Sequence, residues 1–268
     1  MRAARGTRAA VLPDAPRLVF LHVSRTGGTT LHAALAARFR PEEACPERFN
    51  GLARIPAEAL ARYRFFSGHF TFETLRLIPA PRLVVTVLRE PRTRLVSLYR
   101  FWRGHGPEHA VGNPLIRLAR RHDLLSFLRS DRFVIVQDMD NRMTRQLVGD
   151  VFASAPGRYA RDAAEGPREV PGAALLASAR ANLAAFDLLG FADALDAVHA
   201  AIAARMGWPP PPPLPRLNAG GPGVPPPESP PPDPAAVAAA LDRLTTLDRP
   251  LWEHALARAG GAPFLARG

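Results

Sequence analysis

Hydroxyl and glycine residues gather near the start of the chain in an order typical of an anion-binding loop. Residues 24–30 read Ser-Arg-Thr-Gly-Gly-Thr-Thr, and they separate an apolar run from a segment with helical apolar spacing. Gly27 and Gly28 let the backbone approach a ligand closely, and the free N–H groups that open a helix attract negative charge. Arg25 adds a planar cation suited to phosphate. Further donors are the hydroxyls of Thr26, Thr29 and Thr30.

The spacing of this loop differs from the G-x-x-x-x-G-K-[ST] pattern of ordinary ATP- and GTP-binding loops. A Gly-Gly turn between a strand and a helix also occurs without any ligand, so the loop alone leaves a purely structural role open. A second stretch of the sequence bears on whether the loop has a ligand. Residues 83–99 place Arg89 directly after another apolar run, and Pro91 then suits the first turn of a helix. Ser97 lies eight positions beyond Arg89, so the two side chains meet only if that helix folds back beside the strand.

Together, Phe-Leu-His-Val-Ser-Arg-Thr-Gly-Gly-Thr and Arg-Glu-Pro-x-x-Arg-x-x-Ser-x-Tyr resemble the two cofactor motifs of the sulfotransferases. The branch they resemble is that of carbohydrate sulfotransferases related to heparan sulfate 2-O-sulfotransferase. In that family the first loop holds the 5′-phosphosulfate of 3′-phosphoadenosine 5′-phosphosulfate (PAPS), and the Arg and Ser of the second motif hold its 3′-phosphate. The resemblance therefore implies that PAPS is the co-substrate. It assigns cofactor binding to Arg25, Thr26, Gly27, Gly28, Thr29, Thr30, Arg89 and Ser97.

The family's loop carries a lysine where this chain has Arg25. The chain contains no lysine at all, so all 35 of its basic residues are arginines. This is a bias of composition, and it means that single arginines are often solvated surface residues. The positive charge of the loop is kept, although a planar guanidinium differs from an ammonium group in reach and donor geometry.

Sulfuryl transfer also needs a cation near the leaving oxygen and a base for the acceptor hydroxyl. Arg25 is the candidate cation. In related 2-O-sulfotransferases a Gly-His at the end of the second strand supplies the base, and Gly68-His69 occupies that place here. An imidazole titrates near 6.5, which suits proton removal at neutral pH. The alternative for His69 is a structural histidine that closes the strand. The other candidate bases are His105, His109 and Glu73.

His22 falls within the first apolar run, so we expect a structural role for it. We see no grouping of His, Asp or Glu with the spacing of metal ligands, and no metal is expected. The preferred function is therefore a sulfotransferase that moves a sulfuryl group from PAPS to a hydroxyl acceptor, expected to be a glycan. A basic protein that binds a nucleotide or a polyanion without catalysis is the alternative. A kinase is a third option, disfavoured because the Walker lysine is missing.

Composition sets further limits. A net charge of +11 and a pI near 11.3 favour anionic partners, although no motif specific for nucleic acid is present. No apolar run approaches the roughly 20 residues of a membrane span, and the arginine-rich start lacks the apolar core of a signal peptide. The single cysteine, Cys45, has no partner for an intrachain disulfide. These features together predict a cytoplasmic protein.

The elements that must position these residues predict an α/β fold. Near-continuous apolar runs at 18–23, 63–70 and 83–88 alternate with helical patterns, which indicates a P-loop-like parallel sheet with helices on both faces. Residues 104–150 read as helical additions, and 154–171 as a polar loop. A further strand is expected within 182–191, followed by a helix over 192–206.

Four regions are expected along the 268 residues. Residues 1–16 form a flexible leader, and 17–207 form the sulfotransferase-like α/β domain. Residues 208–234 contain 14 of the 29 prolines, so they form either an extended linker or a lid built around Arg216-Leu217-Asn218. Residues 235–268 carry one C-terminal helix, over 235–259, that packs on the same domain.

Overall fold

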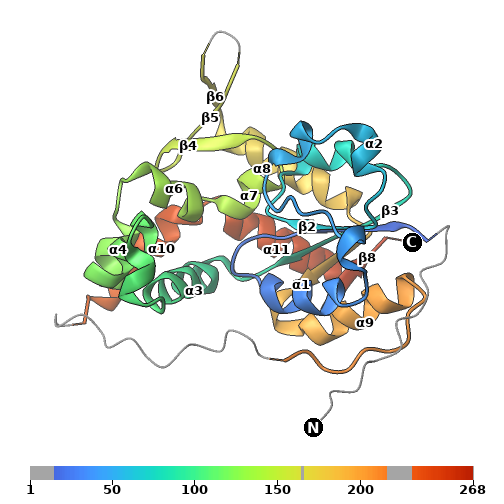
Figure 1. Ribbon diagram of the computed structural model, residues 1–268. Coiled ribbons are helices and arrows are strands. Elements are labelled where there is room, and N and C mark those ends of the chain that lie inside the picture. The colour runs from blue at the N-terminus through green and yellow to red at the C-terminus, as the bar shows by residue number, and fades with distance from the viewer. Residues whose placement is uncertain (1–14, 164–165, 216–230, 268) are drawn as a thin grey trace.

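The computed structural model describes residues 15–163, 166–215 and 231–267. Five strands form the central sheet in the order β2-β1-β3-β7-β8 (Figure 1). Their bounds are β1 (Arg17–Leu21), β2 (Phe65–Gly68), β3 (Arg82–Leu88), β7 (Leu188–Phe191) and β8 (Phe264–Ala266). The first four are parallel, as predicted, because the connections between them are crossovers that return the chain to the same end of the sheet. The prediction missed β8, which runs antiparallel to β7.

Helices surround this sheet on both sides (Figure 1). They are α1 (Gly28–Ala36), α2 (Ala57–Leu60), α3 (Pro91–Arg103), α4 (Pro114–Arg121), α5 (Leu124–Leu128), α6 (Phe133–Met139), α7 (Arg142–Gln146), α8 (Gly172–Asn182), α9 (Leu195–Arg205), α10 (Pro234–Leu244) and α11 (Asp248–Ala259). The mixed α/β class is therefore confirmed. The helical additions expected between 104 and 150 are the short helices α4 to α7.

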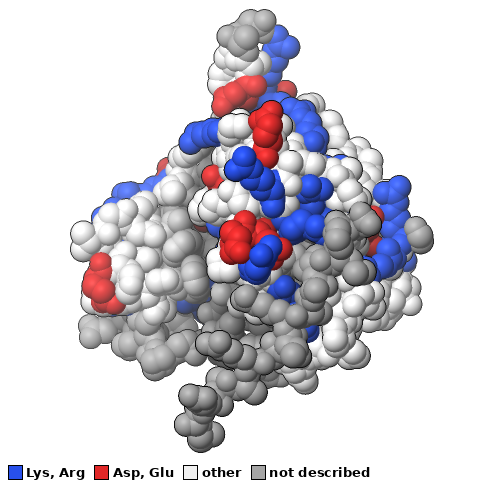
Figure 2. Space-filling view, turned by 45° about the vertical axis from the view of Figure 1, so that its right-hand side comes forward, with Lys and Arg blue, Asp and Glu red and all other residues white. Residues whose placement is uncertain are grey.

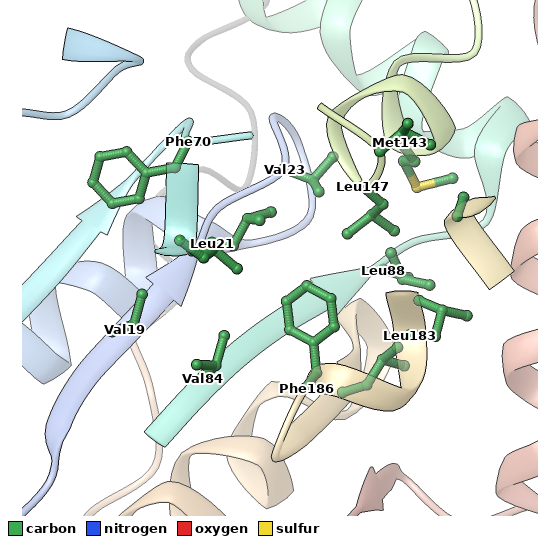
Figure 3. Packing of buried hydrophobic residues seen from close by; sticks show 14 of the residues in the cluster. Val19, Leu21, Val23, Phe70, Val84, Leu88, Met143, Leu147, Leu183 and Phe186 are labelled. Atoms are coloured by element: carbon green, nitrogen blue, oxygen red, sulfur yellow. The ribbon is translucent and has the colours of Figure 1, made fainter. Parts of the chain in front are cut away.

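Alternate residues of β1 feed two separate cores. Leu18 and Phe20 pack with α1 and α9 on one face of the sheet. Val19 and Leu21 pack with α8 and α11 on the other, and Figure 3 shows them beside Val84 of β3. Because both faces of the strand are covered, its residues 18–21 are all apolar rather than apolar at alternate positions.

A third core joins α3 to the helices α4, α5, α6 and α10. Its aromatic members include Tyr99 and Phe127, whose ring centroids lie 5.4 Å apart. Arg103 lies beside this core and donates from Nη1 to the carbonyl of Ala119 at 2.8 Å. The helical cluster extends the molecule beyond the sheet (Figure 1). It fixes α3, whose first turns carry Ser97.

The polar loop predicted over 154–171 is wrong. This part of the chain forms a small antiparallel sheet of β4 (Val151–Ala155), β5 (Arg158–Arg161) and β6 (Arg168–Val170). Gly157 has φ 77°, a conformation that favours glycine, and it closes the tight turn between β4 and β5. Tyr159 of β5 is only 3% exposed and packs this small sheet against the core. These strands were not recognised from the sequence because their outward residues are polar and their apolar residues are few.

The single C-terminal helix predicted over 235–259 is also wrong, since α10 and α11 are separated by a break at Thr245 and Thr246. The break lets a new helix start against α7. The Oδ1 of Asn141, the residue before α7, accepts hydrogen bonds from the N–H groups of Leu247 and Asp248 at 2.6 and 2.9 Å. In return, Asp248 accepts from the N–H groups of Met143 and Thr144 at 3.2 and 2.7 Å.

Two helix N-termini thus cap each other, and we call this arrangement the reciprocal cap (Asn141 and Asp248). Two positive helix ends in contact would repel, and the carboxylate of Asp248 offsets that charge. Its second partner is Arg94 of α3, whose Nη2 lies 3.9 Å from an Asp248 oxygen. Both side chains have no exposure at all. The reciprocal cap therefore ties α3, α7 and α11 into one unit.

The proline-rich segment is described in part. Residues 208–215 follow α9, and Trp208 packs edge-on against Phe39 with ring centroids 5.7 Å apart. The N–H of Leu214 donates to Asp196 of α9 at 2.7 Å. Arg216, Leu217 and Asn218, on which a lid was predicted, lie outside the described residues, as do residues 1–14 of the predicted leader.

Candidate active site

A cleft of about 1240 Å³ lies at the C-terminal ends of the parallel strands. Each of four strands delivers charged or titratable residues to it: β1 leads to His22 and Arg25, β2 to His69, β3 to Arg89 and β7 to Asp193. Ligands of open α/β sheets bind at this edge. The first and second motifs, which are 64 residues apart in sequence when measured from Arg25 to Arg89, therefore meet in one cleft.

The two glycines of residues 24–30 occupy positions where any side chain would clash with its neighbours. Gly27 has φ 84°, and a Cβ on it would come within 2.3 Å of Leu195. A Cβ on Gly28 would lie 1.9 Å from the His22 ring. Helix α1 begins at Gly28 without a side-chain cap, and no acidic residue occupies its first turn. Its first N–H groups thus remain available for an anion at the cleft.

The three predicted threonines have different positions. Thr29 and Thr30 line the cleft. Thr26 does not: it is fully buried, and its Oγ1 donates to the carbonyl of Val23 at 2.9 Å. Its hydroxyl stabilises the turn that shapes the loop, so the direct donor role expected for that hydroxyl is not seen.

Arg25 adopts φ 67°, a left-handed conformation that a non-glycine residue takes rarely. Its guanidinium lies 4.2 Å from the centroid of the Phe101 ring, and its Nε and Nη2 each lie 3.4 Å from the Oγ of Ser97. Burial, and then the charge of Arg89, lower the pKa of Arg25 to about 10. The side chain therefore stays cationic at neutral pH and is held in place by α3.

Arg89 and Ser97 line the same cleft, but each contacts Arg25. Arg89 donates from Nη1 to the backbone oxygen of Arg25 at 3.1 Å. Ser97 reaches the Arg25 side chain because α3 begins at Pro91 and runs back past the loop. The fold-back that their spacing required is thus present, and Arg25 connects the two motifs.

His69 lies directly after β2, as predicted. Its Nδ1 is 2.8 Å from the carbonyl oxygen of His22, which can only accept, so Nδ1 carries the proton and Nε2 is the basic nitrogen. Its ring stacks on His22 with centroids 4.5 Å apart, and Phe49 lies 5.8 Å away on the other side. Burial lowers the pKa of His69 below 6.5, against the opposing effect of its hydrogen bond to His22.

The loop that carries Phe49 is held by a second histidine. Arg48 donates from Nη1 to His32 Nε2 at 2.8 Å, and His32 Nδ1 lies 2.9 Å from Ser67 Oγ. Burial, with the charge of Arg48, lowers the pKa of His32 to about 4. This chain of contacts joins α1, β2 and the loop, and the backbone oxygen of Arg48 in turn accepts the N–H of His69 at 2.7 Å.

The other candidate bases are less well positioned than His69 to accept a proton in the cleft. His105 lines the cleft, but its Nδ1 is 2.8 Å from the backbone oxygen of Phe101. His109 is exposed and pairs with Glu108 at 2.9 Å. Glu73 is not among the residues that line the cleft, and it pairs with Arg161 at 2.6 Å.

Several residues of the cleft were missed by sequence reasoning, among them Phe49, Arg100, Asp138, Arg142 and Asp193. The charge of Arg142 lowers the pKa of His69, while that of Asp138 raises it. Phe49 is an isolated loop aromatic and is 66% exposed.

The positive charge of the protein is not gathered in one place. On the face shown in Figure 2, arginines occur in several separate groups with acidic side chains between them. In the cleft itself, Arg25, Arg89, Arg100 and Arg142 outnumber Asp138 and Asp193. Net charge therefore says little about the ligand, whereas the local excess in the cleft favours an anion.

The described residues contain no group of three or more His, Cys, Asp or Glu side chains that could hold a metal ion. Within the same residues, no helix is both long and apolar enough to cross a membrane.

Comparison with known proteins adds one likeness. Over 86 residues the chain is 33% identical to a protein-tyrosine sulfotransferase from Arabidopsis thaliana. The match covers 31% of this chain and 17% of the relative. No protein-family model matches the chain. The likeness supports a distant relationship to sulfotransferases, and it does not support the heparan sulfate 2-O-sulfotransferase branch suggested by the motifs.

Proposed function

We propose that the protein transfers a sulfuryl group from PAPS to a hydroxyl acceptor. The observation that carries this proposal is the meeting of three groups in one cleft: the α1 N-terminus, the linked Arg25, Arg89 and Ser97, and the basic nitrogen of His69. A cleft of about 1240 Å³ exceeds the roughly 300–1,000 Å³ of common ligand sites, so a nucleotide and an acceptor can occupy it together.

The residues fit the charges of such a co-substrate. The N–H groups at Gly28, Thr29 and Thr30 suit the 5′-phosphosulfate, in the manner of a P-loop. Arg89 and Ser97 suit the 3′-phosphate. Arg25, between the two, meets the negative charge that develops on the leaving oxygen.

His69 completes the reaction. Its Nε2 takes the acceptor proton while the acceptor oxygen bonds to sulfur. The bond from sulfur to the bridging oxygen of the 5′-phosphate breaks, and its electron pair stays on that oxygen. The products are the sulfated acceptor and adenosine 3′,5′-bisphosphate.

For the acceptor we propose a carbohydrate hydroxyl, on the residues that resemble the carbohydrate branch. The name of the Arabidopsis relative makes a peptide tyrosine the competing acceptor. Phe49, at the cleft beside His69, offers an apolar face to either ring. Incubation with labelled PAPS and matched panels of sugar polymers and tyrosine peptides would decide between them, and label in peptides alone would reject the carbohydrate.

The choice of nucleotide is the first prediction. Adenosine 3′,5′-bisphosphate should raise the melting temperature far more than ATP or AMP, because only it carries both phosphates for which the cleft has cations. A ligand at a hundred times its dissociation constant stabilises the fold by about 2.7 kcal/mol, which a melting curve resolves. Equal shifts with ATP and with the bisphosphate would count against the proposal.

Arg89→Ala should weaken bisphosphate binding about ten- to a hundredfold, because a charged hydrogen bond to phosphate contributes about 1.5–3 kcal/mol. AMP lacks the 3′-phosphate, so its affinity should change much less. Calorimetric titration of both nucleotides gives the comparison. Arg121→Ala removes one exposed charge outside the cleft and serves as the control. A similar loss for AMP and bisphosphate would show that Arg89 acts through the backbone of Arg25.

A further inference from the structure

His22 is a buried histidine whose ring is not fully hydrogen-bonded among the described residues. Its imidazole is 6% exposed, and its Nδ1 is buried without a hydrogen-bond partner among the described residues. Burying an unpaired polar group is unfavourable, by about 1–3 kcal/mol in mutational data. Nε2, at the opposite edge of the ring, is the nitrogen left for a ligand in the cleft. The structural role expected from the sequence does not account for it.

The other edge of the ring faces the loop. The Cδ2 and Nε2 atoms of His22 approach Gly28 so closely that a Cβ there would lie 1.9 Å from both. Gly28 opens α1, so Nε2 lies beside the free N–H groups that attract an anion. His22 is also among the residues that line the cleft.

The protonation state follows from the surroundings. Burial, and then the charges of His69, Arg48, His32 and Arg25, hold the pKa of His22 well below 6.5, so the ring is neutral. A neutral imidazole carries one N–H. Either neutral tautomer leaves the buried Nδ1 unpaired. Orphaned N–H donors are rarer in proteins than orphaned acceptors, so we place the hydrogen on Nε2, where it points a donor at the loop.

His22 and His69 form a stacked pair whose Nε2 atoms have opposite hydrogen-bonding properties. The backbone oxygen of His22 accepts Nδ1–H of His69 and so leaves His69 Nε2 as a base. The side chain of His22 offers the opposite property, an Nε2–H donor, between that base and the loop. His22 therefore lies next to both the base and the loop.

We propose that His22 donates a hydrogen bond from Nε2 to a sulfuryl oxygen during transfer, as a catalytic residue of the reaction proposed above. The inference rests on that proposed function. No proton leaves His22: the hydrogen bond stabilises charge on the SO₃ group while the bond to the leaving oxygen breaks and the bond to the acceptor forms. The bisphosphate product lacks the sulfuryl group, so His22 contributes to PAPS turnover and not to bisphosphate affinity.

Three substitutions test this. His22→Gln places an amide N–H near the position of Nε2, His22→Asn places one near Nδ1, and His22→Phe keeps the ring without nitrogen. Removing one donor of this kind costs on the order of 10²–10³-fold in rate. We expect that loss of PAPS consumption, with water as acceptor, for the Asn and Phe variants, and partial rescue by Gln. Bisphosphate-induced stabilisation should stay within about twofold in affinity for all three.

His199 provides a matched control. It is 4% exposed, and both of its ring nitrogens lack partners among the described residues, but it lies on α9 and does not line the cleft. His199→Phe should leave PAPS consumption unchanged. Wild-type turnover in His22→Phe, or an equal loss of bisphosphate affinity, would overturn the role of His22 alone. A wild-type protein that does not bind PAPS would overturn the proposed function and this role with it.

Discussion

Replacing His69 by alanine is expected to lower the rate of sulfuryl transfer about 10²–10⁴-fold, which is the usual contribution of a positioned general base. Bisphosphate affinity should stay near that of the wild type, because the basic Nε2 serves the acceptor and not the nucleotide. Initial rates with an identified acceptor, together with a bisphosphate titration, measure the two quantities separately.

The pH profile gives an independent test. His69 must be neutral to accept a proton, and burial lowers its pKa below 6.5. The rate should therefore be fully developed at neutral pH and fall only as the pH drops through this lowered value. The alanine variant should lose that limb of the profile.

Arg25→Ala supplies the contrast, since it should impair PAPS binding as well as transfer. If His69→Ala kept full transfer, His69 would be a structural histidine, and His105, which also lines the cleft, would be the next candidate base. If the wild type bound the bisphosphate but transferred to no acceptor, the non-catalytic binding protein would be the better description.

Asp248→Asn is expected to destabilise the fold by about 3–5 kcal/mol, because it removes the ion-pair partner of the buried Arg94 guanidinium. The change preserves the shape of the side chain but removes the negative charge between two helix N-termini. For a protein of this size the loss corresponds to about 6–20 °C in melting temperature. Denaturant unfolding and calorimetry both measure it.

The same helix offers the control. Arg249 and Glu253 form an exposed pair at 2.9 Å, one turn into α11. Glu253→Gln should cost less than about 1 kcal/mol, as exposed pairs do. Equal small effects of the two substitutions would mean that the reciprocal cap does not hold α3, α7 and α11 together.

Much of the sheet could be predicted because its strands are covered on both faces. Residues 18–21 are all apolar and 83–88 are apolar except for Thr86, and Gly27 and Pro91 mark the turns that follow. The local sequence thus indicates where each strand ends and which residues lie beyond it. Since parallel strands end at one edge, Arg25, His69 and Arg89 could be expected to share a cleft.

Other features depend on partners far away in the sequence. The break between α10 and α11 is required by Asn141, more than a hundred residues earlier. Arg25 contacts Ser97 only because of how α3 packs. Asp138 and Phe49 have no periodic signal, since their importance lies in proximity to His69. The place of His22 in the cleft wall was not predicted, because the residue follows directly on the apolar run of a buried strand.

The position of the reciprocal cap and of β8 has a consequence for synthesis on the ribosome. Every residue of β1, β2 and β3 is made well before Asp248, which caps α7, and before residues 264–266, which complete the sheet edge. While those residues are still being added, β7 exposes an unpaired edge and the N-terminus of α7 lacks its cap. An exposed edge of this kind recruits other chains. Nascent chains are therefore most vulnerable to aggregation, and most in need of a chaperone, between the emergence of β7 and that of β8.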